Sequence, residues 1–77
     1  MDNINIDQID NLIHSQYGEI GELHLEDNYV SFEVYRGDYE EAPQEIGDGD
    51  IEMQLYEKFD DPFFAVAYRI TRMSNAD

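Results

Sequence analysis

The spacing of the apolar residues changes once along this chain, close to Gly21, and this change constrains the fold more than any other feature. Before it, apolar residues recur at helical spacing among polar ones, which predicts an amphipathic helix over about residues 5–17. After it, apolar and polar residues alternate, which predicts strands with one buried face. We therefore expect an α+β domain with one N-terminal helix packed on a four-stranded antiparallel sheet.

The ends of the predicted helix carry recognisable signals. Asn5 and Gln8 have the spacing of a capping box, and Ile4 and Ile9 have the spacing of a hydrophobic staple. Gly18 is placed to end the helix in the left-handed conformation. The apolar stripe between these ends is made by Ile6, Ile9, Leu12, Ile13 and Tyr17.

Four strands are expected, over about residues 22–27, 29–36, 50–57 and 63–73. Asp27 and Asn28 supply a tight turn between the first two strands, and Asp60-Asp61-Pro62 connects the last two. Residues 37–49 contain glycines and Pro43 and are expected to form an acidic loop. Both faces of the last strand are partly apolar, which is typical of a strand in the middle of a sheet or at a dimer contact. A homodimer is therefore left open as an alternative.

The chain of 77 residues is expected to form a single small acidic domain over 1–77. It has no cysteine, so neither a disulfide nor a thiolate zinc site stabilises it. Four Phe and six Tyr residues indicate a globular chain and not a disordered acidic tail.

The net charge of the chain indicates the kind of surface that a partner would have. Nineteen Asp and Glu residues against four Lys and Arg residues give a net charge of −15, whereas solubility of a small domain requires only about 2 to 8 charges. Such a surface suits a partner with a basic surface, and basic surfaces in cells are commonly built to bind nucleic acid. The sign of the charge opposes direct nucleic-acid binding. A salt-adapted halophilic surface is the alternative, which the Ile and Asn content disfavours.

If the helix covers one sheet face, acids and tyrosines share the other. Carboxylates two residues apart on a strand are about 6.6 to 6.8 Å apart, which is comparable to neighbouring phosphates of a nucleic acid. Exposed tyrosines are frequent interface anchors, and rim carboxylates steer association. The simpler alternative is a sheet face that is merely solvated. The candidate partner-binding residues are Glu22, Glu26, Tyr29, Glu33, Tyr35, Asp38, Glu40, Glu41, Glu45, Asp48, Asp50, Glu52 and Tyr56.

The sequence contains no convincing motif for a metal site or for catalysis. Residues 48–52 open like a calcium loop, but Met53 and Phe59 stand where the loop needs glycine and glutamate. His14 and His24 lack ligand spacing, and no nucleophile or phosphate-loop motif is present. We expect no cofactor and no catalysis. The chain shows neither a signal peptide nor a membrane span, so a cytoplasmic location is expected.

Small size, acidity, lack of cysteine and lack of catalytic motifs are similar in character to anti-CRISPR and anti-restriction proteins as a class, although no motif places the chain in a named family. This resemblance implies an inhibitor of phage or mobile-element origin that mimics DNA. Its target would be the basic surface of a CRISPR effector or restriction enzyme in the host cytoplasm. An immunity protein or antitoxin that caps a basic nuclease is the second hypothesis. The third is an acidic interaction domain that binds through the last strand, around Phe63, Ala65 and Ala67.

Overall fold

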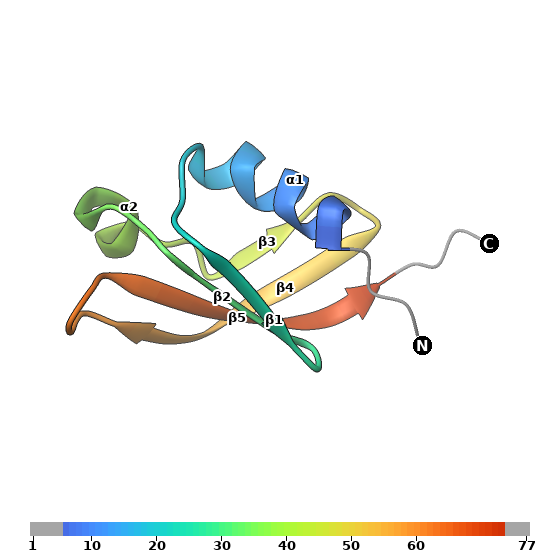
Figure 1. Ribbon diagram of the computed structural model, residues 1–77. Coiled ribbons are helices and arrows are strands. Elements are labelled where there is room, and N and C mark those ends of the chain that lie inside the picture. Colours follow the sequence, from blue (N-terminus) through green and yellow to red (C-terminus); the bar gives the residue numbers. More distant parts are fainter. Residues whose placement is uncertain (1–5, 74–77) are drawn as a thin grey trace.

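The structure is a computed structural model that describes residues 6–73. Within this range, two helices and five strands follow one another, and Figure 1 shows their arrangement. They are α1 (Ile6–Tyr17), β1 (Leu23–Glu26), β2 (Tyr29–Glu33), α2 (Arg36–Glu40), β3 (Glu45–Gly47), β4 (Ile51–Phe59) and β5 (Ala65–Met73). The α+β class, the N-terminal helix and the antiparallel sheet are confirmed, but the sheet has five strands and not four.

The five strands form one sheet in the order β1-β2-β5-β4-β3, with every neighbouring pair antiparallel. The last strand, β5, thus lies at the centre, which is one of the two positions expected from its partly apolar faces. The β1–β2 turn is tight, and Asp27 adopts a φ of 55° in it. Next to the turn, Asn28 accepts a backbone hydrogen bond from Ile70 and donates its side-chain amide to the Ile70 carbonyl, which fixes the hairpin to β5.

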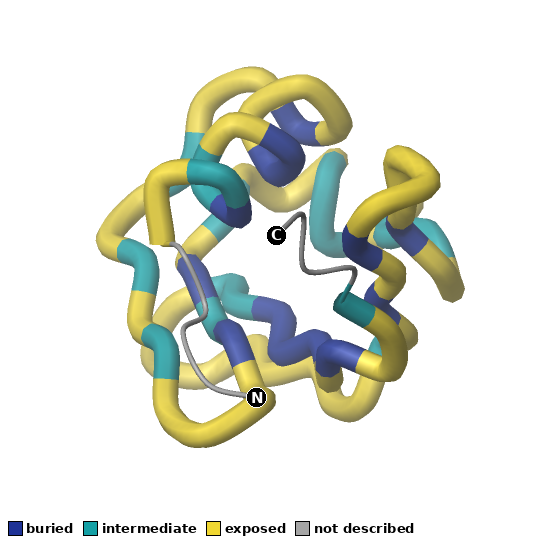
Figure 2. The backbone as a smooth tube through the Cα atoms, turned by 90° about the vertical axis from the view of Figure 1, so that its right-hand side faces the viewer, coloured by how far each residue is buried: buried dark blue, intermediate teal, exposed yellow. Residues whose placement is uncertain are grey.

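Helix α1 lies across one face of the sheet (Figure 1). Seen along the molecule, the buried positions of the strands and of α1 face a common interior (Figure 2). Gly18 ends the helix with a φ of 80° and donates its N–H to the His14 carbonyl, as the sequence predicts. The predicted cap at Asn5 and staple at Ile4 lie outside the described residues. The core consists of Ile9, Leu12, Ile13, Tyr17, Val30, Phe32, Ile46, Ile51, Met53, Val66, Tyr68 and Ile70.

Two tyrosine hydroxyls are buried in this core and satisfy each other. Tyr68 is fully buried and donates its hydroxyl to the Pro43 carbonyl at 2.7 Å, so the Tyr17 hydroxyl is the donor to Tyr68. The Tyr68 ring also stacks against Phe32, and the Tyr17 ring meets Phe32 edge-on. One phenol therefore joins α1, β5 and the segment before β3.

The segment after β2 differs from its prediction. The strand expected over residues 29–36 ends at Glu33, and Tyr35 is the N-cap residue of α2. The predicted loop over residues 37–49 contains most of α2 and all of β3. Strand β3 inserts Ile46 into the core and pairs with β4, which accounts for the fifth strand.

Candidate functional site

The outer face, which is the sheet face opposite α1, is organised in three cross-strand rows. Residues directly opposite each other in an antiparallel pair lie on the same face, about 4.5 to 5.5 Å apart. The register therefore defines a tyrosine row of Glu26, Tyr29, Arg69, Gln54 and Glu45, a small row of His24, Ser31, Ala67 and Glu57, and a phenylalanine row of Glu33, Ala65 and Phe59.

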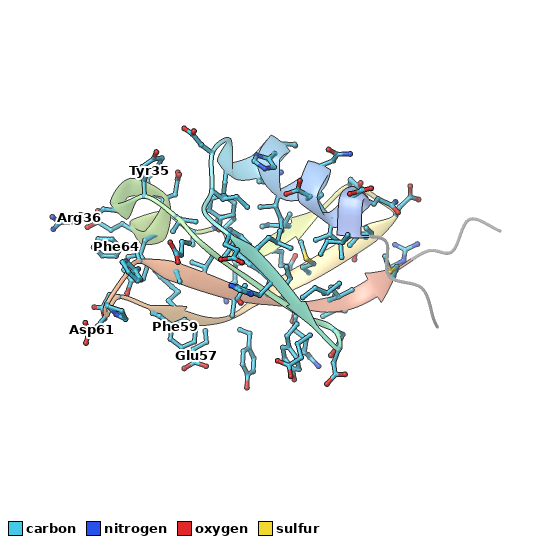
Figure 3. All side chains as sticks on the ribbon, viewed as in Figure 1. Tyr35, Arg36, Glu57, Phe59, Asp61 and Phe64 are labelled. Atoms are coloured by element: carbon cyan, nitrogen blue, oxygen red, sulfur yellow. The ribbon has the colours of Figure 1, made fainter. Side chains whose placement is uncertain are left out.

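Aromatic side chains remain exposed on this face. Tyr56 is 60% exposed, Phe59 is 40% exposed and Tyr29 is 38% exposed. The rings of Tyr29 and Tyr56 lie 5.0 Å apart between centroids and are tilted by 54°. Figure 3 shows Phe59 pointing away from the side that α1 covers. Large exposed aromatic side chains that gather on one face are typical of a binding surface.

A groove of about 180 Å³ lies among these rings. Its lining combines the small row with Glu26, Tyr29, Tyr56 and Phe59. Ser31 and Ala67 are short side chains on the neighbouring strands β2 and β5, and Ala67 is only 8% exposed. The groove therefore forms because Ser31 and Ala67 project little from the sheet, whereas the neighbouring rings of Tyr29, Tyr56 and Phe59 project further.

Two carboxylates, those of Glu26 and Glu57, belong to the lining of the groove, and others lie on the same face. Glu26, Glu33 and Glu57 are exposed, and Figure 3 shows Glu57 next to Phe59 on the same side of the sheet. Glu22 also belongs to this face, because its Oε1 lies 3.9 Å from His24 Nε2. Arg69 is the cation of the tyrosine row, opposite Tyr29 and Gln54. Acids thus outnumber bases on this face.

The structure brings together part of the predicted partner-binding set. Glu26, Tyr29 and Tyr56 line the groove, and Glu22 lies beside His24 of its lining. Glu33 belongs to the phenylalanine row of the same face but lines a separate pocket next to Gly21. The register puts Glu45 and Glu52 on this face, toward β3. Glu52 is paired with Arg72 at 3.5 Å, and Glu45 accepts a hydrogen bond from Gln54.

The other predicted residues lie elsewhere. Tyr35 was expected on the outer face, but the strand ends before it and its side chain belongs to the α2 end of the molecule (Figure 3). Asp38 and Glu40 are on α2 and Glu41 is its C-cap residue, with Arg36 paired to Glu40 at 3.2 Å. Asp48 and Asp50 are in the β3–β4 turn.

The Asp48 carboxylate has a structural role. It accepts hydrogen bonds from the backbone N–H groups of Ile51 and Asp50, at 3.0 and 2.9 Å. These bonds, the one from Ile51 above all, lower the pKa of Asp48 below its ordinary value because they stabilise the charged form. Asp48 therefore closes the turn, in which Gly49 has a φ of 97°.

Glu57, Phe59 and the floor of the groove were not in the predicted set. A register irregularity between Leu55 and Glu57 changes the parity of β4, so residues 52, 54 and 56 are followed by 57 and 59 on the outer face. The sequence signal for it is weak, since the run Tyr56-Glu57-Lys58-Phe59 simply stops alternating.

Within residues 6–73, no group of three or more His, Asp or Glu side chains has the arrangement of a metal site. The same part of the chain contains no helix with the length and apolarity needed to cross a membrane.

A scan against protein-family models and searches of curated proteins and of solved structures gave no significant match to this chain.

Proposed function

We propose that this protein is an acidic inhibitor that uses its outer face to occupy the basic nucleic-acid-binding surface of a defence protein, such as a CRISPR effector or a restriction enzyme. The observation that supports the proposal most is the exposed Tyr29–Tyr56 pair with Phe59, surrounded by carboxylates. Because it would compete with nucleic acid for the target, the protein itself needs no catalytic group. A phage or mobile-element origin and action in the host cytoplasm are part of the same proposal.

Two physical contributions support binding through this face. The rings bury much area at a small cost in side-chain entropy, so they supply affinity and a slow dissociation rate. The net charge of −15 attracts a basic surface over the range of the Debye length, so it raises the association rate at low salt.

The test is competition with DNA. The immobilised protein is incubated with nuclease-treated bacterial lysate and eluted with duplex DNA or with uncharged dextran, and the eluted proteins are purified. The DNA affinity of each is then measured by anisotropy with and without the acidic protein. We expect DNA to release a nucleic-acid-binding protein, and we expect the inhibition to weaken steeply as salt rises.

Matched charge reversals test the surface. Glu26→Lys combined with Glu57→Lys should weaken inhibition by about tenfold or more, which corresponds to about 1.4 kcal/mol. The control pair Glu41→Lys and Asp50→Lys changes the net charge equally but lies away from the groove. Inhibition that is insensitive to salt, or a ternary complex with DNA still bound, would contradict DNA competition. An immunity protein would instead inhibit one toxin nuclease encoded beside its own gene.

A further inference from the structure

The groove of the outer face has a shape and a charge that suit one basic side chain. Its floor is the small row, and the tyrosine and phenylalanine rows lie on either side, about 13 Å apart because each is two residues away along the strands. The side chains of these two rows occupy part of that distance. The space left between them accommodates a side chain lying across the strands, but not a helix, whose diameter with side chains is about 10 to 12 Å.

The walls of the groove favour a planar cation. Tyr56 and Phe59 both line it and expose more than a third of their surface. The face of an aromatic ring attracts a cation that lies within about 6 Å of the ring centroid. The chain already contains one such contact, because Lys58 Nζ lies 4.6 Å from the ring centroid of Tyr39 on the other side of the sheet.

The charges of the outer face favour binding of a cation at the β4 end of the groove. Glu57 ends the small row on β4, between the rings of Tyr56 and Phe59 in the sequence. The phenylalanine row contains Glu33 and no basic residue, whereas Arg69 occupies the tyrosine row beside Tyr29 and repels a second cation there. A cation is therefore best placed at the β4 end of the groove, where Tyr56, Glu57 and Phe59 belong to the lining and Arg69 does not.

We propose that this end of the groove binds one arginine side chain of the partner, with its guanidinium against the rings of Tyr56 and Phe59 and paired with the Glu57 carboxylate. Arginine fits better than lysine because its guanidinium is planar, weakly hydrated and able to pair with a carboxylate through two N–H groups. The inference rests on the proposed function only in that the partner is basic. It adds the side chain that anchors that partner.

The test uses two amidated peptides of equal charge, one of alternating glycine and arginine and one of alternating glycine and lysine. Binding to the ¹⁵N-labelled protein is followed by NMR at fixed ionic strength. We expect the arginine peptide to bind more tightly and to shift the amide signals of Ser31, Ala67 and Phe59 most. Tyr56→Leu should reduce its affinity by about 3- to 30-fold, the range of a cation–π contact, and Tyr56→Phe should preserve it.

Tyr35→Leu is the matched control, since it also removes an exposed tyrosine but lies at the α2 end of the molecule. Its affinity for the arginine peptide should equal that of the wild type. Equal affinity for the two peptides, or shifts that spread over α2 and the β3–β4 turn, would overturn the arginine site. That outcome would leave the DNA-competition result intact, whereas loss of DNA competition with a retained arginine site would overturn only the proposed function.

Discussion

At the scale of single residues, the buried phenols of Tyr17 and Tyr68 determine how the protein responds to alkali. Burial raises the pKa of Tyr68 far above its ordinary value, and its contact with Tyr17 raises it further. Burial also raises the pKa of Tyr17, although the hydrogen bond to Tyr68 partly offsets this. Both phenols therefore keep their protons in the folded protein at a pH where an unfolded chain loses them.

We predict that stability falls above about pH 10. A raised folded-state pKa contributes stability that is fully present below the unfolded pKa of about 10 and is lost as the pH rises toward the folded value. Each such phenol adds a slope of about 1.4 kcal/mol per pH unit. Urea unfolding between pH 8 and 11 at constant ionic strength measures it. Tyr68→Phe should give a shallower slope than the wild type, and Tyr35→Phe removes an exposed phenol as a control. A flat profile up to pH 11 would refute the prediction.

At the scale of elements, the β3–β4 turn depends on one carboxylate. Asp48 accepts two backbone N–H groups, and its own N–H donates to the Ile51 carbonyl. We predict that Asp48→Ala lowers the free energy of unfolding at pH 7 by about 1 kcal/mol, the usual value of such a bond near the surface. Asp50→Ala is the control, because it changes the charge equally and leaves these bonds intact.

The same turn should respond to acid. Because the folded-state pKa of Asp48 is lowered, its stabilising contribution is present above the unfolded pKa of about 3.9 and is lost as the pH falls through the folded value. The difference between the Asp48→Ala and Asp50→Ala variants in urea unfolding should therefore shrink in strong acid. Equal stabilities of the two variants at pH 7 would show that the turn does not need the carboxylate.

The elements that the sequence predicts well are those with enough residues to show a period. Helix α1 has an apolar stripe over 12 residues, and β4 and β5 have nine residues each. Strand β3 has three residues and buries only Ile46, so no alternation distinguishes it from a loop. Helix α2 has five residues and none that is buried. Tyr35 was misplaced because the alternation of β2 continues in the sequence beyond the point where pairing with β5 ends.

At the scale of the whole molecule, the sequence predicts which kinds of residue form the site better than it predicts their arrangement. Alternation alone placed Tyr29, Tyr56 and several acids on one face. It could not supply the strand order, and it is the order β1-β2-β5-β4 that aligns Ser31 with Ala67 and creates the floor of the groove. The irregularity in β4 that brings Glu57 and Phe59 to the same face is likewise a property of the paired sheet.

The charge that is proposed to attract a partner should also destabilise the fold. Nineteen acids in a molecule with a radius of gyration of 11.9 Å repel one another, and unfolding separates them. The Debye length falls from about 30 Å at 0.01 M salt to about 3 Å at 1 M. We therefore predict that the free energy of unfolding rises between low salt and about 0.5 M sodium chloride and then levels off, because the repulsion is by then screened.

Urea unfolding at several salt concentrations tests this, with the double variant Glu26→Gln and Glu33→Gln beside the wild type. Removing two acids from the outer face should increase stability at low salt and reduce the gain on adding salt, since less repulsion is left to screen. The same measurements separate two origins of the acidity. A halophilic surface would need molar salt to fold and would keep gaining stability there, whereas a surface acidic for a basic partner should already be folded at low salt. Stability that does not change below 0.5 M would show that the acids barely interact, and the repulsion argument would then fail.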